Sequence, residues 1–543
     1  MKSYLIFKTA RENQLQQLED TQLTWDVLVI GGGATGLGIA LDAISRGYKT
    51  LLVEQSDFAK GTSSRSTKLI HGGVRYLAQG DVRLVREASI ERGLLCRNAP
   101  HLVKNQPFII PVYSIWDKYK YTIGLKLYDW IAGKLSLGSS VFISRQQTLE
   151  ALPGIKQDGL LGGVRYQDGQ FDDARLAINL AQTIIEKGGT ALNYVRVMDL
   201  IKDQNKITGA VLQDVENDKL YEVNARAIIN ATGVFVDDIL RMDNPSAQKT
   251  ICVSQGIHVV LDKKFFPAQY ALMIPKTSDG RVLFAVPWHN KLILGTTDTP
   301  VAEASLEPKA MEEEIDFILE TAGEFLTVKP ERKDILSIFA GLRPLAAPKK
   351  DSDTTKEISR SHKITTSPSG LFTMLGGKWT TFRKMGEDMM DHIEKYSGWK
   401  RRKSGSASIK IHGAAPSNGI SDPLDYYGSD AAFIKQHMNG SAGQWISPAL
   451  HIHKEQVRWA VEHEMARTLE DVLSRRTRAL LLDAAESIRI AETVARYMAE
   501  LLKKDELWIL QQLEQYKNLA SQYLYQNKQP GAVYELHKGL NAI

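Results

Sequence analysis

The sequence predicts an α/β fold followed by a helical domain, and three observations support this prediction. Between about residues 25 and 395, short apolar runs alternate with helical patterns and glycine-rich turns, which is typical of α/β proteins. After residue 423, apolar residues recur every three or four positions, which is the period of amphipathic helices. A chain of 543 residues is also long enough for two or three domains with buried cores.

Composition and charge exclude several classes of protein. Hydrophobic residues make up 43% of the chain and charged residues 24%, as in ordinary globular proteins. The net charge of +5 does not favour nucleic acid, but it suits an anionic small molecule or an acidic membrane surface. Cys96 and Cys252 are far apart, so we expect no disulfide framework, no metal site and a reducing compartment. No apolar run is long enough to span a bilayer, and Tyr4–Phe7 is too short for a secretory signal.

Changes in composition set the expected domain boundaries. Residues 1–24 are polar and Gln-rich, and we expect them to form a helix outside the main fold. Residues 25–395 form the α/β part, residues 396–423 a Gly-, Ser- and Pro-rich linker, and residues 424–543 the C-terminal helical domain. The run Lys400–Lys403 in the linker favours a solvated surface over a contact with nucleic acid or lipid.

Two segments of the C-terminal domain carry the helical period most clearly. The first has an apolar residue at every fourth position, and the second repeats the pattern. Their apolar residues are Val457, Val461, Met465, Leu469 and Leu473, and then Val494, Tyr497, Met498, Leu501 and Leu502.

The strongest local signal is a complete βαβ unit near the N-terminus. An apolar strand, 25–30, runs into the turn Gly-Gly-Gly-Ala-Thr-Gly at 31–36. A helix at 37–45 follows, and then a second strand at 50–53. This order predicts a Rossmann-like dinucleotide-binding unit, in which the helix N-terminus faces the phosphates.

Four residues of this unit have specific expected roles. Gly31 permits the tight turn, Gly33 lets the backbone approach a pyrophosphate, and Gly36 lets helix and strand pack closely. Glu54 ends the second strand, where it can accept hydrogen bonds from ribose hydroxyls. The unit alone does not separate FAD from NAD, but the strand ending in Ala-Thr-Gly233 resembles the return strand of FAD enzymes.

Several further stretches, taken together and in order, resemble the aerobic glycerol-3-phosphate dehydrogenases. The resemblance is close over residues 25–390 and weaker in the C-terminal domain, where Arg475–Arg478 resembles the family's helical cap domain. The stretches are Gly61–Leu77, Asp172–Leu176, Gly256–Val260, Gly295–Asp298, Gly341–Leu345, Glu357–Arg360 and Gly376–Thr381.

The resemblance implies a fold like that of D-amino-acid oxidase. In that fold an FAD-binding domain interleaves with a mixed-sheet substrate domain, and the active site lies between them. The resemblance also implies oxidation of sn-glycerol 3-phosphate to dihydroxyacetone phosphate, with hydride transfer from C2 to N5 of FAD and electrons passed to a membrane quinone. It implies a cytoplasmic enzyme, peripheral on the inner face of the cell membrane, and it leaves open whether the protein is a homodimer.

The expected substrate site is rich in arginine. Glycerol 3-phosphate carries a phosphate dianion, and a guanidinium group can bind such an anion with two parallel hydrogen bonds. Arg343 and Arg360 match the family's phosphate-binding arginines. Arg75 matches a residue that faces substrate in the family, with Tyr76 beside it.

His258 is the expected catalytic base, because oxidation of an alcohol also releases the hydroxyl proton. It lies in the strand pattern Gly-Ile-His-Val-Val and matches the family's candidate base. His71 is the rival, but its segment resembles backbone that contacts the flavin. Lys378 precedes a helical pattern near Thr380, whose N-terminus would stabilise negative charge on a reduced flavin. We therefore place His258, Arg75 and Lys378 in the catalytic set.

The remaining site residues are expected at the cofactor, while two acidic positions stay outside this group. Asp172 or Asp173 is expected to cap a helix that begins at Ala174, and Asp298 has no assigned role. The expected cofactor contacts beyond the βαβ unit are Ser63, Ser64, Lys68, His71, Gly73, Gly233, Gly377, Lys378 and Thr380.

The segment Tyr119–Leu135 mixes aromatic, aliphatic and lysine residues. Such a mixture suits a helix that lies in a membrane interface. It also suits a core helix with a solvated basic edge, and the sequence leaves both interpretations open.

Three other functions compete with the dehydrogenase. An oxidase on the same scaffold would pass electrons to oxygen, but we see no room for the extra insertion that such relatives carry. An FAD enzyme for another small anion would need one arginine for a carboxylate, whereas Arg343 and Arg360 suit phosphate better. A non-catalytic FAD-binding module would have no use for Arg75 and His258.

Overall fold

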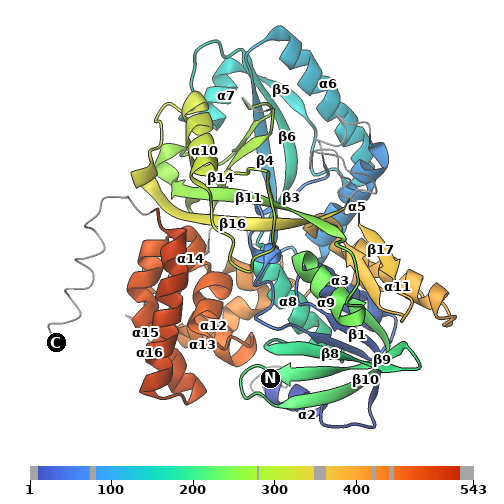
Figure 1. Cartoon of the computed structure of the whole chain (residues 1–543). Coiled ribbons are helices and arrows are strands. Elements are labelled where there is room, and N and C mark those ends of the chain that lie inside the picture. Colours follow the sequence, from blue (N-terminus) through green and yellow to red (C-terminus); the bar gives the residue numbers. More distant parts are fainter. Residues whose placement is uncertain are drawn as a thin grey trace.

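The computed structural model describes residues 10–73, 81–277, 280–347, 362–416, 422–438 and 445–525. Arg75, Tyr76 and Arg360, which the sequence places in the substrate site, lie outside these described residues. Figure 1 shows a lower sheet with its helices, an upper sheet, and a helical C-terminal region beside both.

The lower sheet contains the βαβ unit at its centre. Its order is β17-β18-β10-β1-β2-β7, with β9 pairing to β10 and β8 to β9. Its strands are β1 (Thr24–Ile30), β2 (Thr50–Val53), β7 (Thr190–Leu192), β8 (Val195–Asp203), β9 (Lys206–Asp214), β10 (Leu220–Asn230), β17 (Lys363–Thr366) and β18 (Phe372–Leu375). Because β1 runs parallel to both β2 and β10, the carboxyl ends of these strands meet at one edge of the sheet.

Alternating residues of β1 bury both faces of this sheet. Val27 and Val29 face α3 (Ala34–Ser45) and belong to one core cluster with residues of α8 (Asp173–Glu186) and α11 (Phe382–Tyr396), which pack on α3. Leu28 and Ile30 face the opposite side, where β8 and β9 cover them. Both faces of the sheet are therefore buried at β1, and this packing fixes the position of the end of β1.

The upper sheet is mixed and has the order β15-β11-β14-β13-β12-β4-β6-β3, with β16 paired to β11 and β5 to β6. The chain enters it after β2 and returns to the lower sheet at β7, so the two domains interleave as predicted. Its strands are β3 (Leu69–Ile70), β4 (Val103–Val112), β5 (Val141–Ser144), β6 (Gly162–Phe171), β11 (Ile251–Asp262), β12 (Ala271–Ile274), β13 (Leu283–Trp288), β14 (Lys291–Gly295), β15 (Thr299–Val301) and β16 (Ile335–Ala346). The helices between these strands are α5 (Val82–Asn98), α6 (Ile115–Ala132), α7 (Arg145–Ala151) and α10 (Glu312–Phe325), whereas α9 (Val236–Asp243) follows β10 and contacts strands of the lower sheet.

The C-terminal region is mostly helical, as predicted, but it also contains the short pair β19 (Trp445–Ser447) and β20 (Ile452–His453). Its helices are α12 (Ala431–Met438), α13 (Lys454–His463), α14 (Ala479–Leu482), α15 (Ala484–Leu502) and α16 (Glu506–Ala520). Its core joins that of the upper sheet through Val260 and Phe339. The fourfold period that begins at Val457 predicts one continuous helix, but α13 ends at His463 and Met465 has a positive φ of 54°.

Two segments that the sequence places outside the main fold pack against it. Helix α2 (Ala10–Gln16) forms as expected, but Arg11 donates a 2.8 Å hydrogen bond to Asp214, and both side chains are buried. The described part of the predicted linker, residues 396–416 and 422–423, includes contacts with the lower domain. Arg402 lies over the ring of Tyr48, and Ser406 donates to the buried Asp42 at 2.7 Å. No helix among the described residues is long and apolar enough to cross a membrane.

Candidate active site

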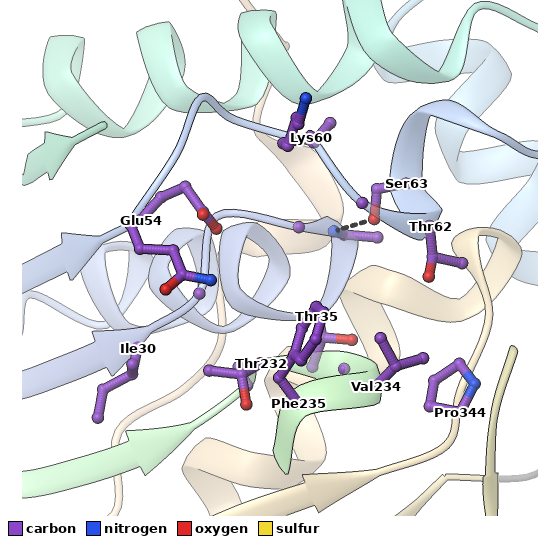
Figure 2. Close-up of a pocket in the computed structure, with 18 of the residues that line it drawn as sticks. Ile30, Thr35, Glu54, Lys60, Thr62, Ser63, Thr232, Val234, Phe235 and Pro344 are labelled. Carbon is purple, nitrogen blue, oxygen red and sulfur yellow. Dashed lines mark hydrogen bonds between the residues drawn. The ribbon is translucent and has the colours of Figure 1, made fainter. Parts of the chain in front are cut away.

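Two adjoining cavities lie between the sheets. The first lies at the carboxyl ends of β1, β2 and β10, and the second is lined by residues of β11, β13 and β16 of the upper sheet. Both cavities are lined by Gly376, Gly377, Lys378 and Trp379. The two spaces therefore adjoin at these residues. Figure 2 shows residues of the first cavity, with Glu54 following β2 and Thr35 in the first turn of α3.

The glycine turn brings backbone to the wall of the first cavity. Gly31 has a φ of +116°, and a Cβ there would lie 2.6 Å from the carbonyl oxygen of Ala231. A Cβ at Gly36 would overlap the carbonyl oxygen of Gly31, so this position accepts only glycine. The expected roles of these glycines in the turn and in close packing agree with this geometry.

Side chains from outside the turn fix its shape. Glu54 accepts hydrogen bonds from the N–H of Gly32 at 2.7 Å and of Ser56 at 2.9 Å. Ser63 accepts one from the N–H of Ala34 at 2.9 Å, which Figure 2 marks with a dashed line. Burial raises the pKa of Glu54, while these backbone N–H groups oppose the shift. Glu54 therefore both lines the cavity and supports the turn that would face a pyrophosphate.

The residues of the first cavity fit a bound dinucleotide. Gly33 and Thr35 lie at the N-terminus of α3, a helix that begins without a side-chain cap, and such an end binds phosphate through its backbone N–H groups. Gly233, with a φ of +62° and no atom within 4 Å of a Cβ built on it, lines the same space. The acidic Glu54 stands where a ribose would lie.

Lys68 and Ser64 lie away from both cavities, contrary to the donor role expected from the sequence. The Lys68 ammonium is completely buried and donates to Asp173 at 2.8 Å and to the carbonyl oxygen of Ser64 at 2.6 Å. The Ser64 hydroxyl donates to the carbonyl oxygen of Gly61 at 3.4 Å. Asp172 is the N-cap of α8, as expected, because it accepts from the N–H of Arg175.

The second cavity contains the expected base, His258. Its Nε2 lies 2.9 Å from the Thr67 hydroxyl, and its ring stacks on Phe339 at 4.8 Å. Gly295 faces His258 across the β11–β14 ladder, and a Cβ there would overlap the imidazole. Burial, and then the charges of Lys68 and Arg343, lower the pKa of His258 well below its usual value. The ring is therefore held neutral, as a proton acceptor must be.

Arg343 lies in the wall of the same cavity and is held in place on several sides. Its guanidinium donates to the carbonyl oxygen of Thr297 at 3.0 Å and forms an ion pair with Asp298 at 3.3 Å. Gly256, opposite Gly341 in the β11–β16 ladder, leaves room for it, since a Cβ there would overlap its Nη2. Asp298, which has no role in the sequence interpretation, thus orients Arg343.

Other predicted residues gather at the same place. Thr380, buried in the turn before α11, lines the second cavity, as do His71 and Gly377. The helical pattern expected near Thr380 is the turn Trp379–Thr381 followed by α11. Gly73 has a φ of +85° and is the last described residue before the segment that carries Arg75. Thr67 and Arg65 also line the cavity, and the sequence interpretation assigns them no role.

A dinucleotide groove beside a cavity that contains a histidine and an arginine is the arrangement of a dinucleotide-dependent oxidoreductase, and the comparisons identify the dinucleotide as FAD. The family model described as FAD dependent oxidoreductase matches residues 26–382, and that described as the C-terminal domain of alpha-glycerophosphate oxidase matches residues 373–507. The mitochondrial glycerol-3-phosphate dehydrogenase of Homo sapiens is 37% identical over 95% of this chain and 75% of its own length. The probable mitochondrial enzyme of Dictyostelium discoideum is 36% identical over 90% of this chain and 82% of its own length. The chain belongs to the FAD-dependent glycerol-3-phosphate dehydrogenase family.

Two solved structures share this fold, and the first is also a glycerol-3-phosphate dehydrogenase. The glycerol-3-phosphate dehydrogenase of Bacillus halodurans, solved with FAD, is 29% identical, with a TM-score of 0.76, and covers 96% of this chain and 99% of its own. The L-alpha-glycerophosphate oxidase of Mycoplasma pneumoniae shares the fold at 16% identity and a TM-score of 0.55, over 70% of this chain and 97% of its own.

Proposed function

We propose that this protein oxidises sn-glycerol 3-phosphate to dihydroxyacetone phosphate, with FAD accepting the hydride and a membrane quinone taking the electrons. The observation that carries the proposal is the junction of the two cavities at Gly376–Trp379, with His258 and Arg343 on the substrate side. FAD, when bound, supplies a two-electron acceptor for the hydride.

Each residue of the second cavity has a role in this chemistry. Arg343 binds the phosphate, because its guanidinium is oriented by Asp298 and Thr297. His258 takes the hydroxyl proton from the substrate, and the Thr67 hydroxyl, 2.9 Å from Nε2, holds the ring in position before the substrate binds. Lys378, at the turn before α11, places a positive charge beside the helix N-terminus, where both stabilise developing negative charge. Arg75, Tyr76 and Arg360 belong to the proposed substrate set through their match to the family's motifs.

The direct test is anaerobic addition of glycerol 3-phosphate to the purified yellow protein. Rapid loss of the flavin's visible absorbance, with none after addition of glycerol or lactate, would support both substrate and cofactor. If the yellow protein did not bleach, the assignment of glycerol 3-phosphate as its substrate would be wrong. The oxidase alternative predicts rapid return of colour in air, whereas a dehydrogenase needs an added quinone for rapid reoxidation.

The pH dependence of the reaction should reflect the lowered pKa of His258. A base with a lowered pKa stays neutral as the pH falls, and it loses activity only when the pH passes below that pKa. We therefore expect the acid limb of kcat/KM to lie below pH 6.5. His258→Gln should lower kcat by about 10²–10⁴-fold, the usual contribution of a general base. An acid limb at or above pH 6.5, or a variant with full activity, would contradict the assignment.

Helix α6 supports the proposed peripheral membrane location. Its inner side buries Leu125 and Tyr128, but its outer side exposes large apolar residues, with Trp116 85% and Trp130 78% exposed. This exposed apolar set favours the membrane-interface interpretation for the outer side of the helix. The exposed apolar set is Ile115, Trp116, Tyr119, Ile123, Leu127 and Trp130. Lys120 and Lys126 are exposed on the same helix, and a basic, aromatic helix of this kind lies well in an anionic membrane interface.

Binding to vesicles tests this surface. The double substitution Trp116→Ser and Trp130→Ser should lower the affinity for phosphatidylglycerol vesicles by about tenfold or more, because two exposed apolar rings are lost. Trp445→Ser, at an exposed site in the C-terminal region, is the matched control and should bind as the unaltered protein does. Equal binding of all three proteins would exclude α6 as the membrane contact.

A further inference from the structure

A buried polar cluster lies at the wall of the second cavity, which one of its members, Asp168, lines. It consists of Arg92 on α5, Tyr128 on α6 and Asp168 on β6, which we call the Arg92–Tyr128–Asp168 cluster. Arg92 Nη1 donates to Asp168 Oδ1 at 2.7 Å and to the Tyr128 hydroxyl at 2.8 Å. The Tyr128 hydroxyl in turn donates to Asp168 Oδ2 at 3.1 Å. The three side chains thus form a closed ring of hydrogen bonds, and each is almost completely buried.

The cluster holds the backbone at His71–Gly73. The N–H of Gly72 donates to Asp168 Oδ1 at 3.3 Å. A Cβ at Gly72 would overlap the Tyr128 hydroxyl and lie 2.7 Å from the Ser89 hydroxyl, so the turn lies directly against the cluster. His71 and Asp168 both line the second cavity. The chain continues from Gly73 into Val74 and Arg75, so this turn is also the start of the segment that carries a proposed substrate residue.

Burying this cluster costs free energy, which makes it an unfavourable arrangement for a purely structural contact. Removing an arginine and a carboxylate from water costs free energy that their attraction only partly restores. Burial, and then Asp168, raise the pKa of Tyr128 well above its ordinary value, so its hydroxyl stays protonated and able to donate. The hydrogen bonds of this buried network hold the backbone that it contacts in one geometry, and that backbone lies at the wall of the second cavity.

We propose that Arg92, Tyr128 and Asp168 are positioning residues for the oxidation of glycerol 3-phosphate, which act by fixing the His71–Gly73 turn beside the substrate. The inference rests on the proposed function, and it extends the site to α5 and α6, which carry no residue of the expected site. None of the three is a base or a phosphate ligand in this proposal. Their effect reaches the substrate through the turn.

Kinetics of two variants test the proposal. Tyr128→Phe should lower kcat/KM for glycerol 3-phosphate about tenfold, and Asp168→Asn about a hundredfold, since the first removes one hydrogen bond and the second breaks the ring. FAD content, measured by visible absorbance, should stay unchanged. The matched control is Tyr516→Phe, which removes another buried hydroxyl, bonded to Ser487 in the C-terminal region. The control should keep kcat/KM within about twofold of the unaltered protein.

Hydrogen exchange of the holoenzyme gives a second readout that needs no turnover. Deuterium uptake in the peptide containing Gly72 should rise in Tyr128→Phe and stay unchanged in Tyr516→Phe. If Tyr128→Phe lowers the melting temperature as Tyr516→Phe does, while its kcat/KM and the uptake at Gly72 stay unchanged, the cluster is only structural and the proposal is wrong. If the unaltered protein does not oxidise glycerol 3-phosphate, the proposed function fails, and faster exchange at Gly72 would still support the anchoring of the turn.

Discussion

Replacing Arg343 with alanine is expected to raise the KM for glycerol 3-phosphate at least about a hundredfold while the protein keeps its FAD. The guanidinium lines the second cavity and not the first, and it is oriented by Asp298 and the carbonyl oxygen of Thr297. A charged hydrogen bond contributes about 1.5–3 kcal/mol, so loss of two such bonds to the phosphate costs about 3–6 kcal/mol. A tenfold change in affinity corresponds to about 1.4 kcal/mol, which gives the expected rise in KM.

Two controls separate phosphate binding from other effects of this substitution. Arg343→Lys keeps the charge but loses the paired geometry of the guanidinium, so its KM should lie between those of the unaltered protein and the alanine variant. Glycerol, which has no phosphate, should be oxidised equally slowly by all three proteins if it is oxidised at all. The assignment of Arg343 would be wrong if the alanine variant showed the ordinary KM for glycerol 3-phosphate and a full complement of FAD.

The βαβ unit could be predicted almost residue by residue, because its information is local. The predicted strand at 25–30 is β1 (Thr24–Ile30), the helix to Ser45 is α3, and the strand at 50–53 is β2. An apolar strand, a glycine turn and a helix specify one another over a short distance in sequence. Local patterns do not predict the interleaving of the two sheets. That prediction depends on the resemblance of many motifs, taken in order, to one family.

The sequence does not reveal contacts between residues that lie far apart in it. The Gly-, Ser- and Pro-rich segment after residue 396 has the composition of a linker, yet Ser406 bonds Asp42, more than three hundred positions earlier. Lys68 lies in a motif that contacts flavin in the family, but its ammonium group donates a hydrogen bond to Asp173. Composition and motif position do not reveal such partners, because the fold alone brings them together.

The candidate site also contains residues that local motifs indicate and residues that they do not. The motifs place His258 and Arg343 in the substrate site, and both line the second cavity, but the motifs do not reveal the groups that hold them there. Gly295 makes room for His258 only through the register of β11 with β14, and Asp298 reaches Arg343 only when β15 lies beside β11. The glycine before Thr-Thr-Asp and the one before Ile-His are signals that a search for small residues next to site residues would have found.

Replacing Glu464 with glutamine is expected to destabilise the protein by about 3–5 kcal/mol, the usual effect of removing one partner of a buried ion pair. Glu464 accepts two hydrogen bonds from Arg175 of α8, at 2.6 and 2.7 Å, and neither side chain is exposed. Burial alone would lower the pKa of Arg175, but Glu464 raises it above its ordinary value. Because Arg175 therefore stays charged, the variant would leave a buried cation without its counter-ion.

Thermal denaturation of the holoenzyme measures this effect, with an exposed ion pair as the matched control. Arg496 pairs with Glu492 and Glu506 on the surface of α15 and α16, and such pairs contribute at most about 1 kcal/mol, so Arg496→Ala should change the melting temperature little. The double variant Arg175→Met, Glu464→Leu should recover much of the stability, because it removes both charges and keeps the volume. If Glu464→Gln lowered the melting temperature no more than Arg496→Ala, the pair would not stabilise the contact between α8 and the C-terminal region. If the double variant were as unstable as Glu464→Gln, the stabilisation would come from the hydrogen-bond geometry of this pair and not from the compensation of its charges.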